Sequence, residues 1–154
     1  MIELMVVVSI IGIVVALSMP NVKNWIARYQ LKQAILELQS NLNLARMAAM
    51  NRNMTITTTL QIANGRVVAT FTDPANTAAG CLANINACAL PTQTMPGQVT
   101  GIGATTSVAF NSLGLRTPGG TANTALQLIN SGGVTYSIGI TPSGRTAWCA
   151  AAAC

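Results

Sequence analysis

The sequence predicts an α+β protein in which a long N-terminal α-helix, bent near Pro20, packs its C-terminal half on an antiparallel β-sheet head. Three observations carry this prediction. Residues 1–20 are almost entirely apolar, residues 31–49 repeat apolar side chains at helical spacing, and from Met54 the pattern alternates. The expected shape is a ladle whose handle is a bare apolar helix.

The apolar run from Met1 to Pro20 contains a single charged residue, Glu3. At a rise of about 1.5 Å per residue, Leu4 to Met19 makes about 24 Å of apolar helix. That is slightly short for a free-standing transmembrane span of about 20 residues, and long for an ordinary core helix. A carboxylate in such a run costs about 2.5–3.5 kcal/mol on insertion scales, so Glu3 is expected to have a partner. The plainer alternative is a carboxylate stabilised by the helix dipole.

The helix is expected to continue from Ile2 to Asn51. Pro20 has no backbone N–H to donate, so it should bend the helix without ending it. Beyond Pro20 the apolar residues recur at alternating four- and three-residue spacing, which predicts an amphipathic helix. The residues of this stripe are Leu31, Ile35, Leu38, Leu42, Ala45 and Ala49.

The head is expected to be an antiparallel sheet. MTITTTLQI alternates from Met54, Asn64-Gly65 is a strong hairpin turn signal, and RVVATFT supplies the partner strand. The stretch from Asp73 to Gly103 is rich in glycine and proline and is expected to be a long irregular excursion. Shorter strands are expected at Ser107–Phe110, Ala125–Ile129, Val134–Ile140 and Arg145–Cys149. The chain thus divides into an apolar helix half (1–24), an amphipathic helix half (25–53) and a β head (54–154).

Composition and charge argue against an enzyme. The chain is 51% hydrophobic and only 7% charged, which suits an extracellular or densely packed subunit. It has no histidine, and Asp73 is the only acid of the head, so a catalytic base, a nucleophile pair and a metal set are all missing. We therefore expect no catalytic residue, no cofactor and no metal. Five of the eight basic residues lie between Lys23 and Arg52, where we expect a solvated helix face and subunit contacts.

The segment IELMVVVSIIGIVVALSMP resembles the N-terminus of mature type IV pilins and type II secretion pseudopilins, the N-terminal methylation-type pilins. These families share a leader cut before a methylated residue, a glutamate four positions further on, and an apolar helix that contains a glycine and ends at a proline. Glu3, Gly12 and Pro20 keep this mutual spacing. Because only two residues precede Glu3, either the chain begins about two residues inside the mature protein or its true N-terminus departs from the family pattern. The resemblance is close over about the first 30 residues.

The head resembles the group that includes the H-type pseudopilins and the DNA-uptake minor pilins of the FimT type. The similarity lies in the phenylalanine strand with its glycine turn, VAFNSLGLRTPGG, and in the late pair Gly144-Arg145. The DNA-uptake members carry Gly-Arg-x-Arg, whereas this sequence has Ala147 at the last position. Arg145 is the candidate nucleic-acid contact, but we expect it to be a turn or strand-edge residue, and nucleic acid is not an expected partner.

For an exported chain, the even number of cysteines favours disulfides. Four cysteines allow three connectivities. The local pairs Cys81-Cys88 and Cys149-Cys154 are favoured because each closes a small loop, and a crossed arrangement stays open.

The resemblance implies a structural subunit of an extracellular type IV pilus-like filament of identical copies, a fimbrium serving adhesion, twitching motility or DNA uptake. The precursor is expected in the inner membrane and the pilus assembly machinery is an expected partner. Glu3 is expected to pair with the terminal amine of a neighbouring copy, while Gly12 and Pro20 bracket a segment that loosens on assembly. Two alternatives stay open: a minor pilin that binds DNA in natural transformation, and a secretion pseudopilin.

Overall fold

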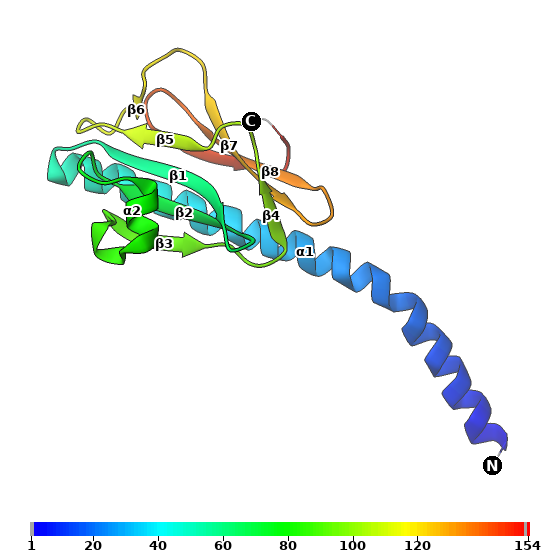
Figure 1. Cartoon of the computed structure of the whole chain (residues 1–154). Coiled ribbons are helices and arrows are strands. Elements are labelled where there is room, and N and C mark those ends of the chain that lie inside the picture. The colour runs from blue at the N-terminus through cyan, green and yellow to red at the C-terminus, as the bar shows by residue number, and fades with distance from the viewer. Residues whose placement is uncertain (1, 153) are drawn as a thin grey trace.

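One continuous helix runs through a third of the protein. The computed structural model describes the backbone of residues 2–152 and 154, and the side chains of those residues except 17–21. Helix α1 spans Ile2–Arg52, which confirms the predicted long helix to within one residue. Figure 1 shows its blue N-terminal part projecting from the head and its cyan part lying along the head. α1 curves between these parts and continues through Pro20, whose side chain lies outside the described residues.

The apolar stripe of α1 is buried as predicted. All six stripe residues are 0% exposed: Leu31, Ile35, Leu38, Leu42, Ala45 and Ala49. Ala34 joins them at 0% and Ala27 at 5%. Their spacing keeps them on one face of the helix, so α1 contributes a continuous apolar ridge to the core.

The strands confirm the antiparallel head but form two sheets where one is predicted. The first sheet has the order β3-β2-β1-β5-β6 and the second the order β4-β7-β8-β9. Strands β1 (Ile56–Ala63) and β2 (Arg66–Thr72) make the predicted hairpin, paired from Thr57↔Thr72 to Ala63↔Arg66. Asn64 and Gly65 have φ of 51° and 72°, and two positive φ values are those of a type I′ turn. The other strands are β3 (Leu90–Thr94), β4 (Val99–Ile102), β5 (Ser107–Phe110), β6 (Arg116–Thr117), β7 (Thr124–Asn130), β8 (Thr135–Ile140) and β9 (Thr146–Cys149).

The prediction that Asp73 to Gly103 is irregular is wrong. The segment contains helix α2 (Ala78–Ala83), the 3-10 helix η1 (Ile85–Ala87), and strands β3 and β4. α2 begins at an N-cap, where the Thr77 hydroxyl accepts a bond from the Gly80 N–H. β3 is held by its pairing with β2, and β4 by its pairing with β7. Both partner strands lie outside this segment. Pairing with them makes strands of residues whose local glycine and proline content predicts irregular structure.

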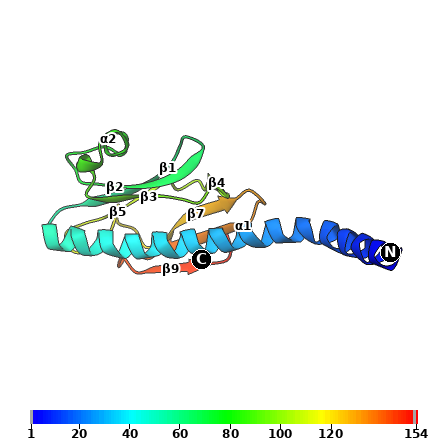
Figure 2. The ribbon, with the colours of Figure 1, turned by 90° about the horizontal axis from the view of Figure 1, so that it is seen from below.

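The core lies between α1 and the two sheets. α1 contacts β1 and β5 of the first sheet and β4, β7, β8 and β9 of the second. Figure 2 shows β1, β2 and β3 on one side of α1 and β9 on the other. Phe71 and Phe110 of the first sheet, and Leu126 and Ile138 of the second, are all 0% exposed. The head therefore completes its own apolar core around one face of the helix.

Leu42→Ala should lower the free energy of unfolding by about 2–5 kcal/mol, because truncating a fully buried leucine leaves a cavity in the core. Leu44→Ala is the matched control, since Leu44 is 46% exposed on the same helix and should change stability by less than about 0.5 kcal/mol. Denaturant unfolding followed by circular dichroism measures both. Equal losses in the two variants would contradict the assignment of the buried face.

Candidate functional site

The N-terminal half of α1 is an apolar surface without a cover. Every described side chain from Ile2 to Ala16 is exposed, with Ile2 at 81% and Leu4 at 72%. A soluble monomer rarely exposes a contiguous apolar surface of this kind, and such surfaces mark contacts with other proteins or with lipid. The bare part of the helix is therefore the candidate site.

The exposed apolar face continues along the part of α1 that packs on the head. Trp25, Tyr29, Leu36 and Met47 are 68%, 61%, 42% and 47% exposed. Their separations of four, seven and eleven residues return to one side of an α-helix, opposite the buried stripe. The rings of Trp25 and Tyr29 are stacked, with centroids 6.0 Å apart and planes at 20°. We call the exposed apolar side chains from Ile2 to Met47 the outer helix face.

Glu3 and Gly12, two of the three residues predicted to act in assembly, lie on the bare part of α1. Glu3 lies in the first turn of α1, and within the described part of the chain no ion pair joins it to another residue. A Cβ added to Gly12 would meet no atom within 4 Å, so nothing inside this chain requires glycine there. The side chain of Pro20 lies outside the described residues. The roles of these residues in assembly stay predictions.

Both local cysteine pairs are bonded in the structure. Cys81 is joined to Cys88 across the α2–η1 turn, and Cys149 to Cys154 at the C-terminal end. The second disulfide holds the tail against β8, where the Ser137 hydroxyl donates to the carbonyl oxygen of Ala151 at 2.8 Å. Neither disulfide lies on the outer helix face, and both cross-link segments of the head.

Arg145 is exposed, and its backbone closes the turn between β8 and β9. Its N–H donates to the Thr141 hydroxyl at 3.1 Å, and its carbonyl oxygen accepts from the Thr141 N–H at 3.0 Å. Among the described residues, no hydrogen bond is made by its guanidinium. Arg145 is thus a turn residue whose side chain faces solvent.

The backbone at position 144 requires glycine, the first residue of the Gly-Arg pair. Its φ is +79°, and an added Cβ would lie 2.1 Å from the carbonyl oxygen of Gly114. The turns that contain Gly114 and Gly144 are both bound by Arg46 of α1. Its Nε donates to Gly114 O at 2.8 Å and its Nη2 to Ser143 O at 3.1 Å. Sequence reasoning placed Arg46 on a solvated face and missed this contact. No local signal reveals it, since the acceptors are backbone carbonyls 68 and 97 residues away.

In the part of the chain that the structure describes, no group of three or more His, Cys, Asp or Glu side chains is placed to hold a metal ion. Over its described residues, no helix has both the length and the apolarity needed to cross a membrane.

Gly144→Ala should destabilise the head more than Gly133→Ala. Both glycines have positive φ, which costs an L-residue about 1–2 kcal/mol, but an added Cβ at Gly133 meets nothing within 4 Å. At Gly144 the clash with Gly114 O should add about 1–3 kcal/mol. Thermal or denaturant unfolding measures the stability of both variants. Equal destabilisation would show that the close approach of the Gly114 and Gly144 turns does not restrict the side chain at position 144.

Comparisons with known proteins agree with this architecture. The family described as type II transport protein GspH matches residues 34–144, more than half of the chain. The crystal structure of the type IV minor pilin FimU of Pseudomonas aeruginosa has a TM-score of 0.55 at 17% identity, covering 77% of this chain and 92% of that one. The minor pseudopilin EpsH from the type 2 secretion system of Vibrio cholerae has a TM-score of 0.51 at 10% identity, covering 79% and 97%. No curated protein matches the chain.

The matched region begins in the packed half of α1 and ends at Gly144, so it contains the buried stripe from Ile35 to Ala49 and every strand except β9. The two solved structures share the fold over about four fifths of this chain. The chain belongs to the GspH family, within the superfamily of type IV pilins and type II secretion pseudopilins.

Proposed function

We propose that the chain is a structural subunit of an extracellular type IV pilus-like helical filament, assembled through the apolar N-terminal half of α1. One observation carries the proposal: the head has a complete core, yet the described side chains from Ile2 to Ala16 are all exposed. A surface that the chain cannot cover by itself is best covered by further copies of the same helix.

The energetics favour a bundle of helices. Burying one exposed aliphatic side chain contributes about 1.5–3 kcal/mol, and the outer helix face carries many of them. Parallel copies of α1 that pack along this face would place Trp25 and Tyr29 in the same contacts. The head, attached by the opposite face of α1, would then point outward.

Glu3 supplies the register in this proposal. In a bundle of apolar helices its carboxylate is buried, and a buried charge without a partner is strongly destabilising. Pairing with the terminal amine of a neighbouring copy neutralises it in one axial register only. Gly12 and Pro20 then allow the intervening turns to adjust, because glycine has a low helix propensity and proline removes a backbone hydrogen bond.

Before assembly the same helix needs another cover, and we propose the inner membrane for this stage. The support is the apolar run of the sequence, with Lys23 following it. The assembly machinery would move the chain from this pool into the filament. Adhesion and twitching motility are the activities such a fibre would serve.

Glu3→Ala should leave the chain in the membrane fraction and reduce its incorporation into fibres, because the variant lacks the charge that selects the register. Glu37→Ala is the matched control, since Glu37 is also an exposed carboxylate of α1 but lies on the packed half. Immunoblots of sheared fibres and of membranes measure both pools. Normal incorporation of the Glu3 variant would contradict the proposal.

The family match favours a second candidate, a type II secretion pseudopilin, because the matching family is described as a transport protein. The two roles differ in what fails when the chain is absent. Loss of surface fibres supports the pilus subunit, whereas loss of protein secretion with fibres intact supports the pseudopilin.

A DNA-binding minor pilin is the third candidate, and the exposed guanidinium of Arg145 is the observation in its favour. We expect at most weak binding, since Ala147 stands where the DNA-uptake pattern has its second arginine. In gel-shift titrations at several salt concentrations, Arg145→Ala should change the affinity for duplex DNA less than twofold. A steep salt dependence that disappears with Arg145 would support the DNA-binding role instead.

A further inference from the structure

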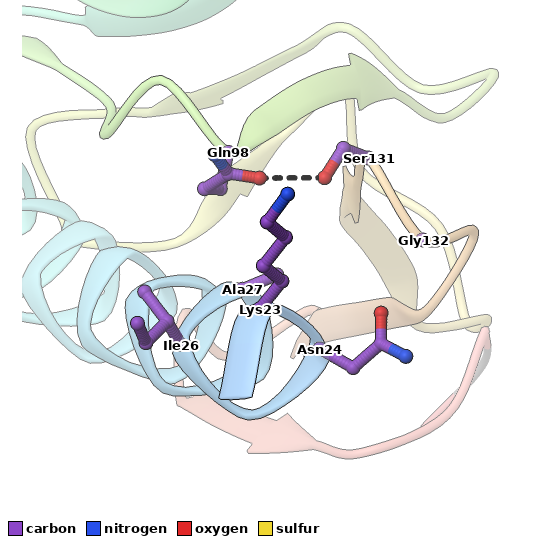
Figure 3. A pocket seen from close by; sticks show the side chains of 7 residues that line it. All are labelled: Lys23, Asn24, Ile26, Ala27, Gln98, Ser131 and Gly132. Atoms are coloured by element: carbon purple, nitrogen blue, oxygen red, sulfur yellow. Dashed lines mark hydrogen bonds between the residues drawn. The ribbon is translucent and has the colours of Figure 1, made fainter. Parts of the chain in front are cut away.

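A pocket of about 450 Å³ opens where α1 leaves the head. One wall is a turn of α1, and the other consists of the segment before β4 and the β7–β8 turn. Figure 3 shows the Lys23 side chain reaching from α1 toward the hydrogen bond between Gln98 and Ser131. The lining residues are Lys23, Asn24, Ile26, Ala27, Gln98, Ser131 and Gly132.

The head side of the pocket is fixed by two hydrogen bonds. The Ser131 hydroxyl donates to Gln98 Oε1 at 2.7 Å, and the Ser131 N–H donates to the Gln98 carbonyl oxygen at 2.9 Å. The Gln98 amide oxygen accepts the first of these bonds, and among the described residues no hydrogen bond is made by the amide N–H groups, so they are available as donors. The two bonds therefore hold the Gln98 amide in place as a hydrogen-bond donor at the pocket.

The charges at this junction are all of one sign. Lys23 lines the pocket. Arg28 lines an adjoining hollow of about 110 Å³, which shares Asn24, Ala27 and Gly132 with the pocket. No acidic residue lines either hollow, and in the described structure no ion pair involves Lys23 or Arg28. The next cation, Lys32, lies 5.9 Å from the centroid of the Trp148 ring. Two cations and amide donors without a carboxylate favour an anionic ligand.

The position along α1 favours a lipid as the source of that anion. Lys23 lies one helical turn beyond the end of the apolar run, and the exposed rings of Trp25 and Tyr29 follow directly. Basic and aromatic residues that flank an apolar helix lie at the headgroup level of a bilayer. When the apolar half of α1 is in the membrane, the pocket therefore faces the lipid phosphates.

We propose that this junction pocket binds the phosphate of an anionic phospholipid headgroup, such as that of phosphatidylglycerol, before the chain is assembled. Lys23 pairs with the phosphate and the amides of Asn24 and Gln98 bind the remaining headgroup oxygens. Zwitterionic headgroups are disfavoured, because their own cation would meet Lys23 and Arg28. This inference rests on the membrane stage of the proposed function.

The test is flotation of the full chain with vesicles of phosphatidylcholine alone or mixed with phosphatidylglycerol. The wild-type chain should prefer the anionic vesicles. Lys23→Gln should weaken binding to them about fivefold, the factor expected for one basic residue near an anionic surface, and leave binding to neutral vesicles unchanged. Gln98→Glu, which is nearly isosteric and alters no charge of α1, should also weaken the preference.

Arg52→Gln is the matched control. It removes the same charge from the same helix about 43 Å away, at the far end of α1, and should keep the preference. Equal losses for Lys23→Gln and Arg52→Gln would assign the effect to net charge and overturn the pocket.

Other outcomes separate this inference from the proposed function. Wild-type binding to both vesicles without preference overturns the pocket alone, whereas binding to neither overturns the membrane stage and the lipid assignment with it. Binding of duplex DNA that disappears in Lys23→Gln would assign the pocket to nucleic acid. Vesicle preference that survives in Lys23→Gln, with fibre incorporation lost, would assign it to a neighbouring copy. Either result overturns the lipid assignment.

Discussion

The burial of one face of α1 between two sheets is the contact on which the rest of the structure depends. The stripe from Leu31 to Ala49 is fully buried, and it touches strands of both sheets. Without it each sheet would expose an apolar face, and the sheets would have no common core. The same contact fixes the rotation of α1 about its axis, so it also determines which side chains of the helix remain outside.

The outer helix face is a direct consequence of this rotation. Trp25, Tyr29 and Leu36 are exposed because the head occupies the opposite side of α1. The described side chains from Ile2 to Ala16 are bare because the head does not reach them. The stability of the head thus depends on one face of α1, and the apolar surface proposed for assembly lies on the rest of the same helix. This division would let a filament subunit complete its own core and still present a large apolar surface to neighbouring copies.

Local patterns predicted α1, its buried stripe and the β1–β2 hairpin, because each is encoded by the spacing of residues close in sequence. β3 and β4 were not predicted, since Pro91 and Gly101 obscure strands that form only against distant partners. The division of the strands into two sheets was not predicted either, because strand pairing depends on contacts distant in sequence. At the candidate site, the apolar run and Glu3 were visible in the sequence. The junction pocket was not, because Lys23, Gln98 and Ser131 become neighbours only when the head folds onto α1.

The central claim, that the outer helix face is covered by other copies in the fibre, can be tested by thiol labelling of purified fibres. Among the described residues no cysteine is free, so an introduced Val8→Cys thiol is a specific probe on α1, and Leu113→Cys is its counterpart on the head, where Leu113 is 72% exposed. The account predicts that the Val8 position is protected in intact fibres and reacts only after their dissociation, while the Leu113 position reacts in both. Rapid labelling of the Val8 position in intact fibres would contradict it.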